Sequence, residues 1–247
     1  MPRALLSRGQ KNLLPKCYSI LTIPLLDSHH GVTRYPRATH NLTRYPGRLT
    51  AVLRMMVAQQ SQELLKATLA RETDIPETTI TSYTDILGRI YLVERIRPWS
   101  RNLVSREKGK PKALVNDSGL AEHLSGQSAQ RWLDSENPSS GFGHAVEGAL
   151  TQELIAQSGW SDQEYEVFHW CDRSGYEVDV FCELPDGTVL AFEIKVGAPR
   201  AKHLDSLKFI RKHLGDRFRA GFVVGHASEV TRWGSDLYSI PWASLWS

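Results

Sequence analysis

The amino-acid sequence predicts an α/β (α+β) chain, in which a small helical module precedes a mixed β-sheet flanked by helices. Residues 49–97 follow the order helix, tight turn, helix, strand. From Gly141 onward, a helix precedes a meander of strands, and a further helix and strand follow. That order is typical of an α/β core with a mixed sheet. The 247 residues are enough for one large domain or two small ones.

The composition indicates a soluble globular protein, with 41% hydrophobic and 23% charged residues. No apolar run is long enough to span a bilayer, and no small-residue cleavage site follows the short apolar stretch Tyr18–Leu26. The three cysteines are odd in number and lack CxxC spacing, which disfavours a zinc site or a disulfide framework. We therefore expect a cytoplasmic protein without membrane contact.

Residues 1–48 are predicted to form a basic, irregular N-terminal extension. The first 50 residues contain eight basic side chains and one acid, so they carry +7, and the rest of the chain carries −4. Prolines and glycines interrupt this segment. A basic arm attracts nucleic acid or acidic partners without sequence choice, and a solvated, poorly ordered extension explains the same residues.

Residues 49–126 are predicted to form a winged-helix domain with a basic loop. Helical spacing predicts one helix around Leu53, a short one over Leu65–Thr73, and a third after Pro76. Tyr91–Arg97 has the composition of a strand, and a proline stops it. This order is the pattern of a winged helix-turn-helix.

The winged-helix prediction offers two candidate contacts with DNA. The helix after Pro76 would be the recognition helix, although its exposed face has few basic groups. The basic loop after the strand would be the wing, which touches phosphates. Packing on a neighbouring domain and a solvated mobile loop are the alternative explanations. The predicted nucleic-acid-binding residues are Arg101, Arg106, Lys108, Lys110 and Lys112.

Residues 127–247 are predicted to form the second domain, which begins with a polar linker up to Ser140. Ala145–Gln157 predicts an amphipathic helix with Leu150 and Leu154 inward. Glu147 lies at the edge of this inward face, where a carboxylate is costly unless a positive group faces it. The other predicted elements are strands at 164–170, 219–225 and 238–241 and a helix at 201–214.

The segment 175–197 is the most informative part of the chain, because it predicts two strands joined by a Pro-Asp-Gly turn. Period-two alternation sorts the side chains of each strand onto two faces. On the first strand, one face has Glu177, Asp179 and Phe181, and the other has Tyr176, Val178, Val180 and Cys182. On the second strand, Glu193 and Lys195 share a face. Two carboxylates and a lysine on one sheet face predict a site for a hard divalent cation beside a phosphate.

The order of helix Glu147, strand Asp179 and Glu193-Ile194-Lys195 resembles the PD-(D/E)XK, restriction-endonuclease-like nuclease fold. The resemblance is closer to the C-terminal region of a family of prokaryotic AAA-type ATPases, which comprises a winged helix and a domain of unknown function. The stretches that carry this second resemblance are Pro98-Trp-Ser-Arg-Asn-Leu103, Asp117–Leu120, Gly143–Leu154 and the two strands of the hairpin.

This resemblance implies a site and a reaction. Asp179 and Glu193 would bind Mg²⁺ or Mn²⁺, with Glu147 as a third ligand, directly or through a water, and Glu177 as a possible substitute. Lys195 would position the attacking water and stabilise the negative charge at phosphorus, so the catalytic set is Lys195, Glu193 and Asp179. The implied reaction is metal-dependent hydrolysis of a phosphodiester in DNA.

The ATPase domain of that family should precede the winged helix, with its Gly-x-x-x-x-Gly-Lys-Ser/Thr phosphate loop. No such stretch occurs in this sequence. We therefore expect a shortened relative that does not itself hydrolyse ATP and has no nucleotide cofactor.

Two other functions explain the same residues. One is a non-catalytic DNA-binding or regulatory module, which needs only the winged helix and the basic arm. The other is a protein-interaction subunit that docks on an ATPase relative or forms a homo-oligomer, with tryptophans such as Trp160, Trp233, Trp242 and Trp246 as anchors. In both cases the acidic and basic residues of the hairpin would form ordinary cross-strand ion pairs.

Overall fold

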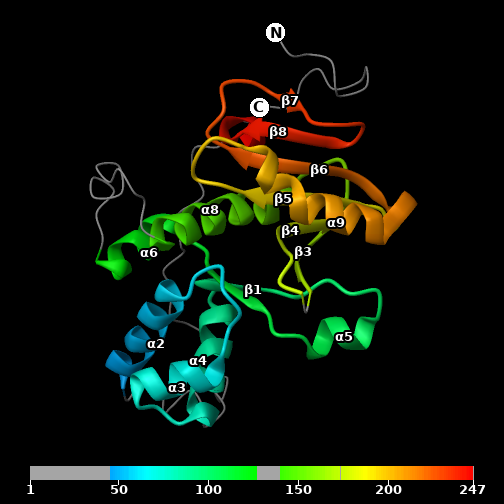
Figure 1. The fold of residues 1–247 in the computed structure, drawn as a ribbon. Coiled ribbons are helices and arrows are strands. Elements are labelled where there is room, and N and C mark those ends of the chain that lie inside the picture. Colours follow the sequence, from blue (N-terminus) through cyan, green and yellow to red (C-terminus); the bar gives the residue numbers. More distant parts are fainter. Residues whose placement is uncertain (1–44, 127–139, 173, 247) are drawn as a thin grey trace. The chain divides into compact units, whose positions relative to one another are not determined.

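The computed structural model describes residues 45–126, 140–172 and 174–246. The predicted basic extension up to residue 44 and the predicted linker over 127–139 lie outside the described residues. The first part of the described chain forms five helices before α8, interrupted by a pair of strands (Figure 1). These elements are α2 (Pro46–Ala58), α3 (Lys66–Thr73), α4 (Glu77–Arg89), β1 (Val93–Ile96), α5 (Leu103–Lys108), β2 (Lys112–Val115) and α6 (Ser118–Ser125).

Helices α2, α3 and α4 enclose the first hydrophobic core. Pro46 occupies the first turn of α2, and Pro76 precedes α4, where a missing backbone N–H has no cost. Helix α4 buries one face, with Ile80 and Leu87 at most 1% exposed. The antiparallel strands β1 and β2 close this core with Val93 and Val115, which are register partners.

The predicted basic loop from Arg101 to Lys112 contains a helix, so the description of this segment as a loop is wrong in this respect. The Asn102 side chain caps α5 by accepting hydrogen bonds from the Val104 and Ser105 N–H groups, at 2.9 and 3.3 Å. These two bonds satisfy backbone N–H groups that have no partner within the first turn of a helix. A short helix of six residues is therefore stable here.

The second part of the described chain contains a six-stranded mixed sheet in the order β3-β4-β5-β6-β8-β7 (Figure 1). Strands β3, β4 and β5 form an antiparallel meander, while β5, β6 and β8 are parallel. The prediction of an α/β chain with a mixed sheet is confirmed. The elements are α8 (Ser140–Ser158), β3 (Glu166–Cys171), β4 (Glu177–Glu183), β5 (Val189–Ile194), η1 (Ala201–Leu204), α9 (Asp205–Leu214), η2 (Gly215–Arg217), β6 (Phe218–Gly225), β7 (Thr231–Arg232), β8 (Leu237–Pro241) and η3 (Trp242–Trp246).

The sheet is covered by α8 on one face and by α9 on the other (Figure 1). Leu150 and Leu154 of α8 pack with Val180 and Cys182, whereas Leu207 of α9 belongs to the other core. Both strands of the hairpin are therefore buried on both faces, which explains why they are apolar along most of their length.

A β-bulge in β4 changes the facing of its side chains. Phe168 pairs with Phe181 and Trp170 with Val178, so one residue of β3 lies opposite two of β4, Asp179 and Val180. Val178 consequently lies in the same core cluster as Phe181. The prediction that Val178 shares a face with Val180 is wrong, because strict alternation does not hold across a bulge.

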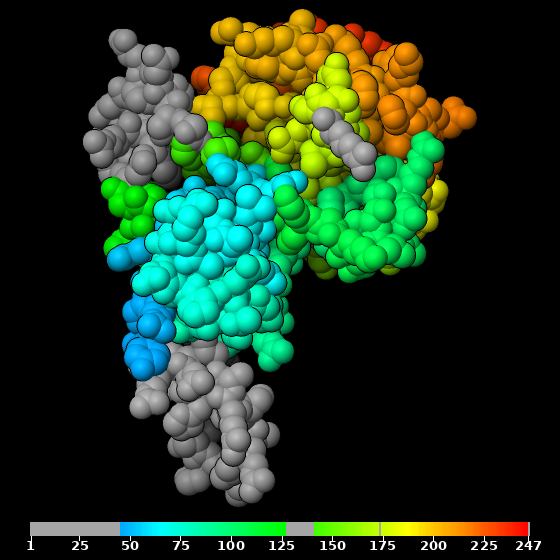
Figure 2. Space-filling model, turned by 60° about the horizontal axis from the view of Figure 1, so that its bottom comes forward, coloured from blue at the N-terminus to red at the C-terminus, as the bar shows by residue number. Residues whose placement is uncertain are grey.

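The two parts of the described chain are joined by backbone and side-chain contacts. The Trp99 N–H donates to the His169 carbonyl at 2.7 Å, and the His169 N–H donates to the Arg97 carbonyl at 3.1 Å. Arg101 near α5 donates to the His213 carbonyl at the end of α9 at 2.8 Å, and Figure 2 shows these segments in green and orange next to each other. Among the described residues, no helix combines the length and the apolar character that a membrane crossing requires.

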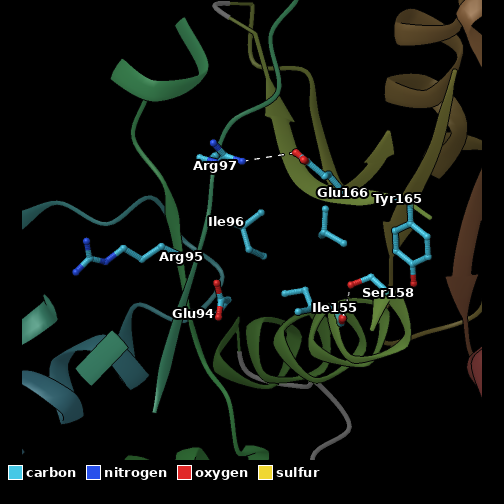
Figure 3. A pocket seen from close by; sticks show the side chains of 9 residues that line it. Glu94, Arg95, Ile96, Arg97, Ile155, Ser158, Tyr165 and Glu166 are labelled. Carbon is cyan, nitrogen blue, oxygen red and sulfur yellow. Dashed lines mark hydrogen bonds and ion pairs between the residues drawn. The ribbon is translucent and has the colours of Figure 1, made fainter. Parts of the chain in front are cut away.

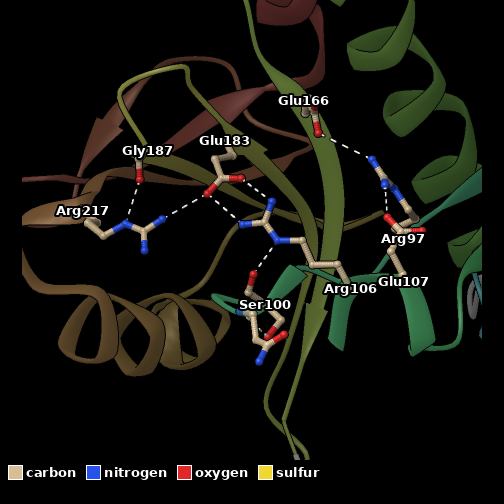
Figure 4. Close-up of polar contacts among 9 residues, drawn as sticks. Arg97, Ser100, Arg106, Glu107, Glu166, Glu183, Gly187 and Arg217 are labelled. Carbon is tan, nitrogen blue, oxygen red and sulfur yellow. Dashed lines mark hydrogen bonds and ion pairs between the residues drawn. The ribbon is translucent and has the colours of Figure 1, made fainter. Parts of the chain in front are cut away.

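Arg106 forms a further, largely buried connection between the two parts (Figure 4). Its guanidinium makes two hydrogen bonds to the Glu183 carboxylate, at 2.6 and 3.0 Å, and its side chain is only 11% exposed. Arg217 reaches the same carboxylate at 3.0 Å. The guanidinium of Arg106 also lies 4.8 Å from the Phe168 ring centroid. The α5 segment is thereby anchored to the sheet.

Candidate functional site

Asp179, Glu193 and Lys195 meet where β4 and β5 separate. The last register pair of these strands is Val180 with Phe192, and the Asp179 carboxylate then accepts a hydrogen bond from the Ile194 N–H at 2.7 Å. Lys195 Nζ lies 2.6 Å from Glu193 Oε1 and 3.6 Å from Asp179 Oδ2. The bulge in β4 and the end of the ladder thus bring the three predicted catalytic side chains together.

Both carboxylates of this group are buried, with Asp179 8% and Glu193 9% exposed. Glu193 uses Oε1 for its contact with Lys195, while its Oε2 is buried without a hydrogen-bond partner. Burial, together with the negative charge of Asp179, raises the pKa of Glu193 well above its ordinary range. An unpaired buried carboxylate oxygen is costly, so this position favours an added positive group.

Glu147 of α8 is the fourth member of the cluster, and Lys112 of β2 is the positive group that faces it. Lys112 Nζ lies 2.8 Å from Glu147 Oε1 and 2.6 Å from Glu177 Oε1. The side chain of Lys112 is 5% exposed and that of Glu147 is 14% exposed. Burial and the charge of Asp179 raise the pKa of Glu147, so Glu147 belongs to the same electrostatic cluster as Asp179.

The cluster contains more acidic than basic side chains. Four carboxylates, those of Glu147, Glu177, Asp179 and Glu193, surround the ammonium groups of Lys112 and Lys195. The carboxylates raise the pKa of both lysines although burial opposes this shift. Both amines are therefore cationic at neutral pH, whereas the raised pKa values of Glu147 and Glu193, about 8, favour the protonated form of these two carboxyl groups there.

The chemistry of these side chains suits a divalent cation, but their positions suit it only in part. Carboxylate oxygens are the ligands that Mg²⁺ and Mn²⁺ prefer. Oε2 of Glu193 has no hydrogen-bond partner and is therefore available as a metal ligand. Among residues 45–126, 140–172 and 174–246, however, no three acidic, histidine or cysteine side chains form a ready-made metal site. The reason is visible in the ion pairs, because the amines of Lys112 and Lys195 lie between the carboxylates.

The structure separates the five predicted nucleic-acid-binding residues into two groups. Arg106 and Lys112 are paired with carboxylates inside the protein, so neither offers a free charge at the surface. Arg101, Lys108 and Lys110 are exposed, and Lys110 lies 3.7 Å from Glu63. Any phosphate contact from this segment would therefore depend on the exposed three.

Lys112 is the site residue whose role the sequence did not reveal. Its predicted role followed from neighbouring basic residues, and only the position of β2 against α8 places it among the carboxylates. The one available signal was Glu147, whose inward position required a positive partner.

A separate open cleft lies between β1, α8 and the start of β3 (Figure 3). Its volume is about 270 Å³, and Glu94, Arg97, Ile155 and Tyr165 are among the residues that line it. Two of the lining residues form an ion pair, in which a guanidinium nitrogen of Arg97 lies 3.6 Å from a carboxylate oxygen of Glu166. None of the predicted catalytic or metal-binding residues lines this cleft.

Comparison with known proteins gives two domain families and no activity. Residues 37–131 match a domain of unknown function, DUF8612, and residues 142–245 match a second one, DUF4143. An uncharacterised protein of Mycobacterium bovis and one of Mycobacterium tuberculosis are each 30% identical over 141 residues. The match covers 57% of this chain and 30% of each relative, so the chain spans less than a third of their length. No solved structure matches.

Proposed function

We propose that the chain is a divalent-metal-dependent phosphodiesterase of the PD-(D/E)XK type that acts on DNA. The observation that supports this proposal is the meeting of the buried Asp179 and Glu193 carboxylates with the half-buried Lys195, while Oε2 of Glu193 has no hydrogen-bond partner. Buried carboxylates with raised pKa values are typical of functional sites, although structural ion pairs also show them.

Each residue has a defined part in this proposal. Asp179 and Glu193 would hold the cation, and the Ile194 N–H keeps the Asp179 carboxylate oriented toward β5. A bound Mg²⁺ or Mn²⁺ would polarise the scissile phosphate and lower the pKa of a bound water. Lys195 would orient the attacking water and stabilise the additional negative charge on the phosphate oxygens. Its main chain is held by β6, because the Lys195 N–H donates to the Val224 carbonyl at 2.8 Å.

A winged-helix module would supply the contact with DNA. Helices α2–α4 followed by the β1–β2 pair have the element order of this motif. The Thr81 and Ser82 hydroxyls of α4 donate to carbonyls of their own helix, which leaves few side chains to read bases. We therefore propose binding to the DNA backbone without sequence preference.

Cleavage of supercoiled plasmid in the presence of Mn²⁺ tests this function. We expect the wild-type protein to nick or linearise the plasmid, and Glu193→Gln and Lys195→Met each to reduce the rate at least about 100-fold, because both groups act on the transition state. Glu166→Gln and Lys208→Met are the matched controls, since both side chains are more than half exposed. Equal rates for wild-type and Glu193→Gln would refute the proposal.

A non-catalytic DNA-binding or regulatory module is the second candidate. The observation that favours it is that Lys112 and Lys195 already form ion pairs with the carboxylates, as in a purely structural network. Such a protein would bind duplex DNA without metal, with an affinity that falls steeply as salt rises. Metal-free binding without cleavage in any divalent cation would support this alternative.

A further inference from the structure

Lys112 comes from the first part of the chain, yet its amine lies inside the acidic cluster of the second. It is 4% exposed as a residue, and Glu147 and Glu177 hold it at 2.8 and 2.6 Å. A lysine is almost never buried to this degree without partners, so the two carboxylates and the amine stabilise one another.

The backbone around Lys112 is fixed from both sides. Strand β2 pairs with β1, where Lys112 is the register partner of Ile96. On its other side, the Leu64 N–H donates to the Pro111 carbonyl at 2.8 Å, and the Ala113 N–H donates to the Gln62 carbonyl at 3.3 Å. The position of the amine is therefore set by the N-terminal module as a whole.

The same amine already pairs with Glu147, one of the ligands of the proposed metal site. Glu147 Oε1 is bonded to Lys112, while Asp179 and Glu193 form a group with Lys195. The charge of Asp179 acts on Glu147, Glu193 and Lys112, so Lys112 and a cation held by Asp179 would repel each other.

We propose that Lys112 is a built-in competitor of the divalent cation, so that the ion pair of Lys112 with Glu147 and metal binding by the acidic cluster exclude each other. This inference rests on the proposed metal site. It makes the N-terminal module a regulator of metal binding, because a shift of β2 that withdraws the amine frees Glu147 for the cation.

The first test is calorimetric titration of the full chain with Mn²⁺ at fixed pH. We expect Lys112→Met to bind Mn²⁺ about tenfold more tightly than wild type, a typical coupling between two sites. Lys110→Met is the matched control, since this nearby lysine is 62% exposed and outside the cluster, and its affinity should equal that of wild type. Equal or weaker binding by Lys112→Met would overturn the inference.

The second test needs no variant and so does not depend on the folding of Lys112→Met. Wild-type protein is acetylated with an amine-reactive ester, with and without Mn²⁺, and the modification of each lysine is measured by mass spectrometry. We expect Mn²⁺ to increase the labelling of Lys112 while that of Lys110 stays constant. Unchanged or reduced labelling of Lys112 at saturating Mn²⁺ would contradict the proposed competition.

Glu193→Gln separates the failure of this inference from the failure of the proposed function. If Glu193→Gln loses Mn²⁺ binding while Lys112→Met binds as wild type does, the metal site stands and only the competition is refuted. If wild type binds no Mn²⁺, or Glu193→Gln binds it equally well, both proposals are refuted.

Discussion

His169 is a buried histidine at the junction between the two parts of the described chain, and it is 1% exposed. Its Nε2 lies 3.2 Å from the Lys110 carbonyl, while Nδ1 is buried without a hydrogen-bond partner. Burial, together with the nearby charge of Lys112, lowers the pKa of His169 to about 4. At neutral pH the imidazole is therefore uncharged, and its protonation would place a second cation beside Lys112.

Protonation of His169 makes the protein less stable in acid. The pKa of His169 is about 4 in the folded state and 6.5 for an ordinary histidine, so the unfolded chain binds the proton more readily between these values. The stabilising contribution is complete above pH 6.5 and is lost as the pH falls toward 4. When the pH falls from 7 to 4.5, the free energy of unfolding should decrease in both proteins. We expect this decrease, measured by urea denaturation, to be about 2 kcal/mol smaller for His169→Gln than for wild type. His123→Gln, at an exposed position, is the control, and its free energy of unfolding should decrease as much as that of wild type. The same dependence of stability on pH in His169→Gln and wild type would contradict the prediction.

The segment after Lys195 depends on a close approach of two elements. At Gly225, the last residue of β6, an added Cβ would lie 2.8 Å from the Gly197 carbonyl oxygen and 2.9 Å from the Pro199 ring. The Gly197 carbonyl accepts a hydrogen bond from the His226 N–H at 3.1 Å, so it cannot move freely. Only glycine allows the chain after Lys195 to cross the end of β6 at this distance.

Gly225→Ala should therefore destabilise the fold by about 1 to 3 kcal/mol, as overpacking against backbone does. Urea denaturation followed by circular dichroism measures this loss. Gly143→Ala in α8 is the matched control, because no atom lies within 4 Å of its added Cβ, and alanine favours a helix by up to about 1 kcal/mol. A Gly225→Ala protein as stable as wild type would show that the loop can shift without cost.

The elements differ in how far the sequence determines them. Helices with regular apolar spacing, such as α4 and α9, and the hairpin with its Pro-Asp-Gly turn were predicted close to their observed bounds. Helix α5 was missed because its stability comes from the Asn102 cap and the pairing of Arg106 with Glu183, and neither has an apolar period. The bulge at Asp179 was missed because it depends on β3, which lies outside the hairpin.

At the scale of the whole described chain, the candidate site is shared between its two parts. The order of Glu147, Asp179, Glu193 and Lys195 in the sequence, read through a resemblance, was enough to predict these four as one group. Lys112 could not be assigned to that group, because its partners Glu147 and Glu177 are far away in the sequence and only tertiary packing joins them.

The contacts between the two parts predict a single cooperative unfolding transition for the full chain. Lys112 and Arg106 are each buried against carboxylates of the other part, so separating the parts would leave unpaired charges in both. Tryptophan fluorescence and far-ultraviolet circular dichroism should give the same midpoint in urea. Two transitions with distinct midpoints would show that the parts unfold independently.

The pairing of Lys112 with Glu147 also limits how such genes can recombine. A chimaera that joins the N-terminal half of one relative to the C-terminal half of another would inherit the amine from one parent and its two acidic partners from the other. A hybrid whose parents carry mismatched charges at these positions would lose about 3 to 5 kcal/mol of stability, so the two halves are expected to be inherited as a pair.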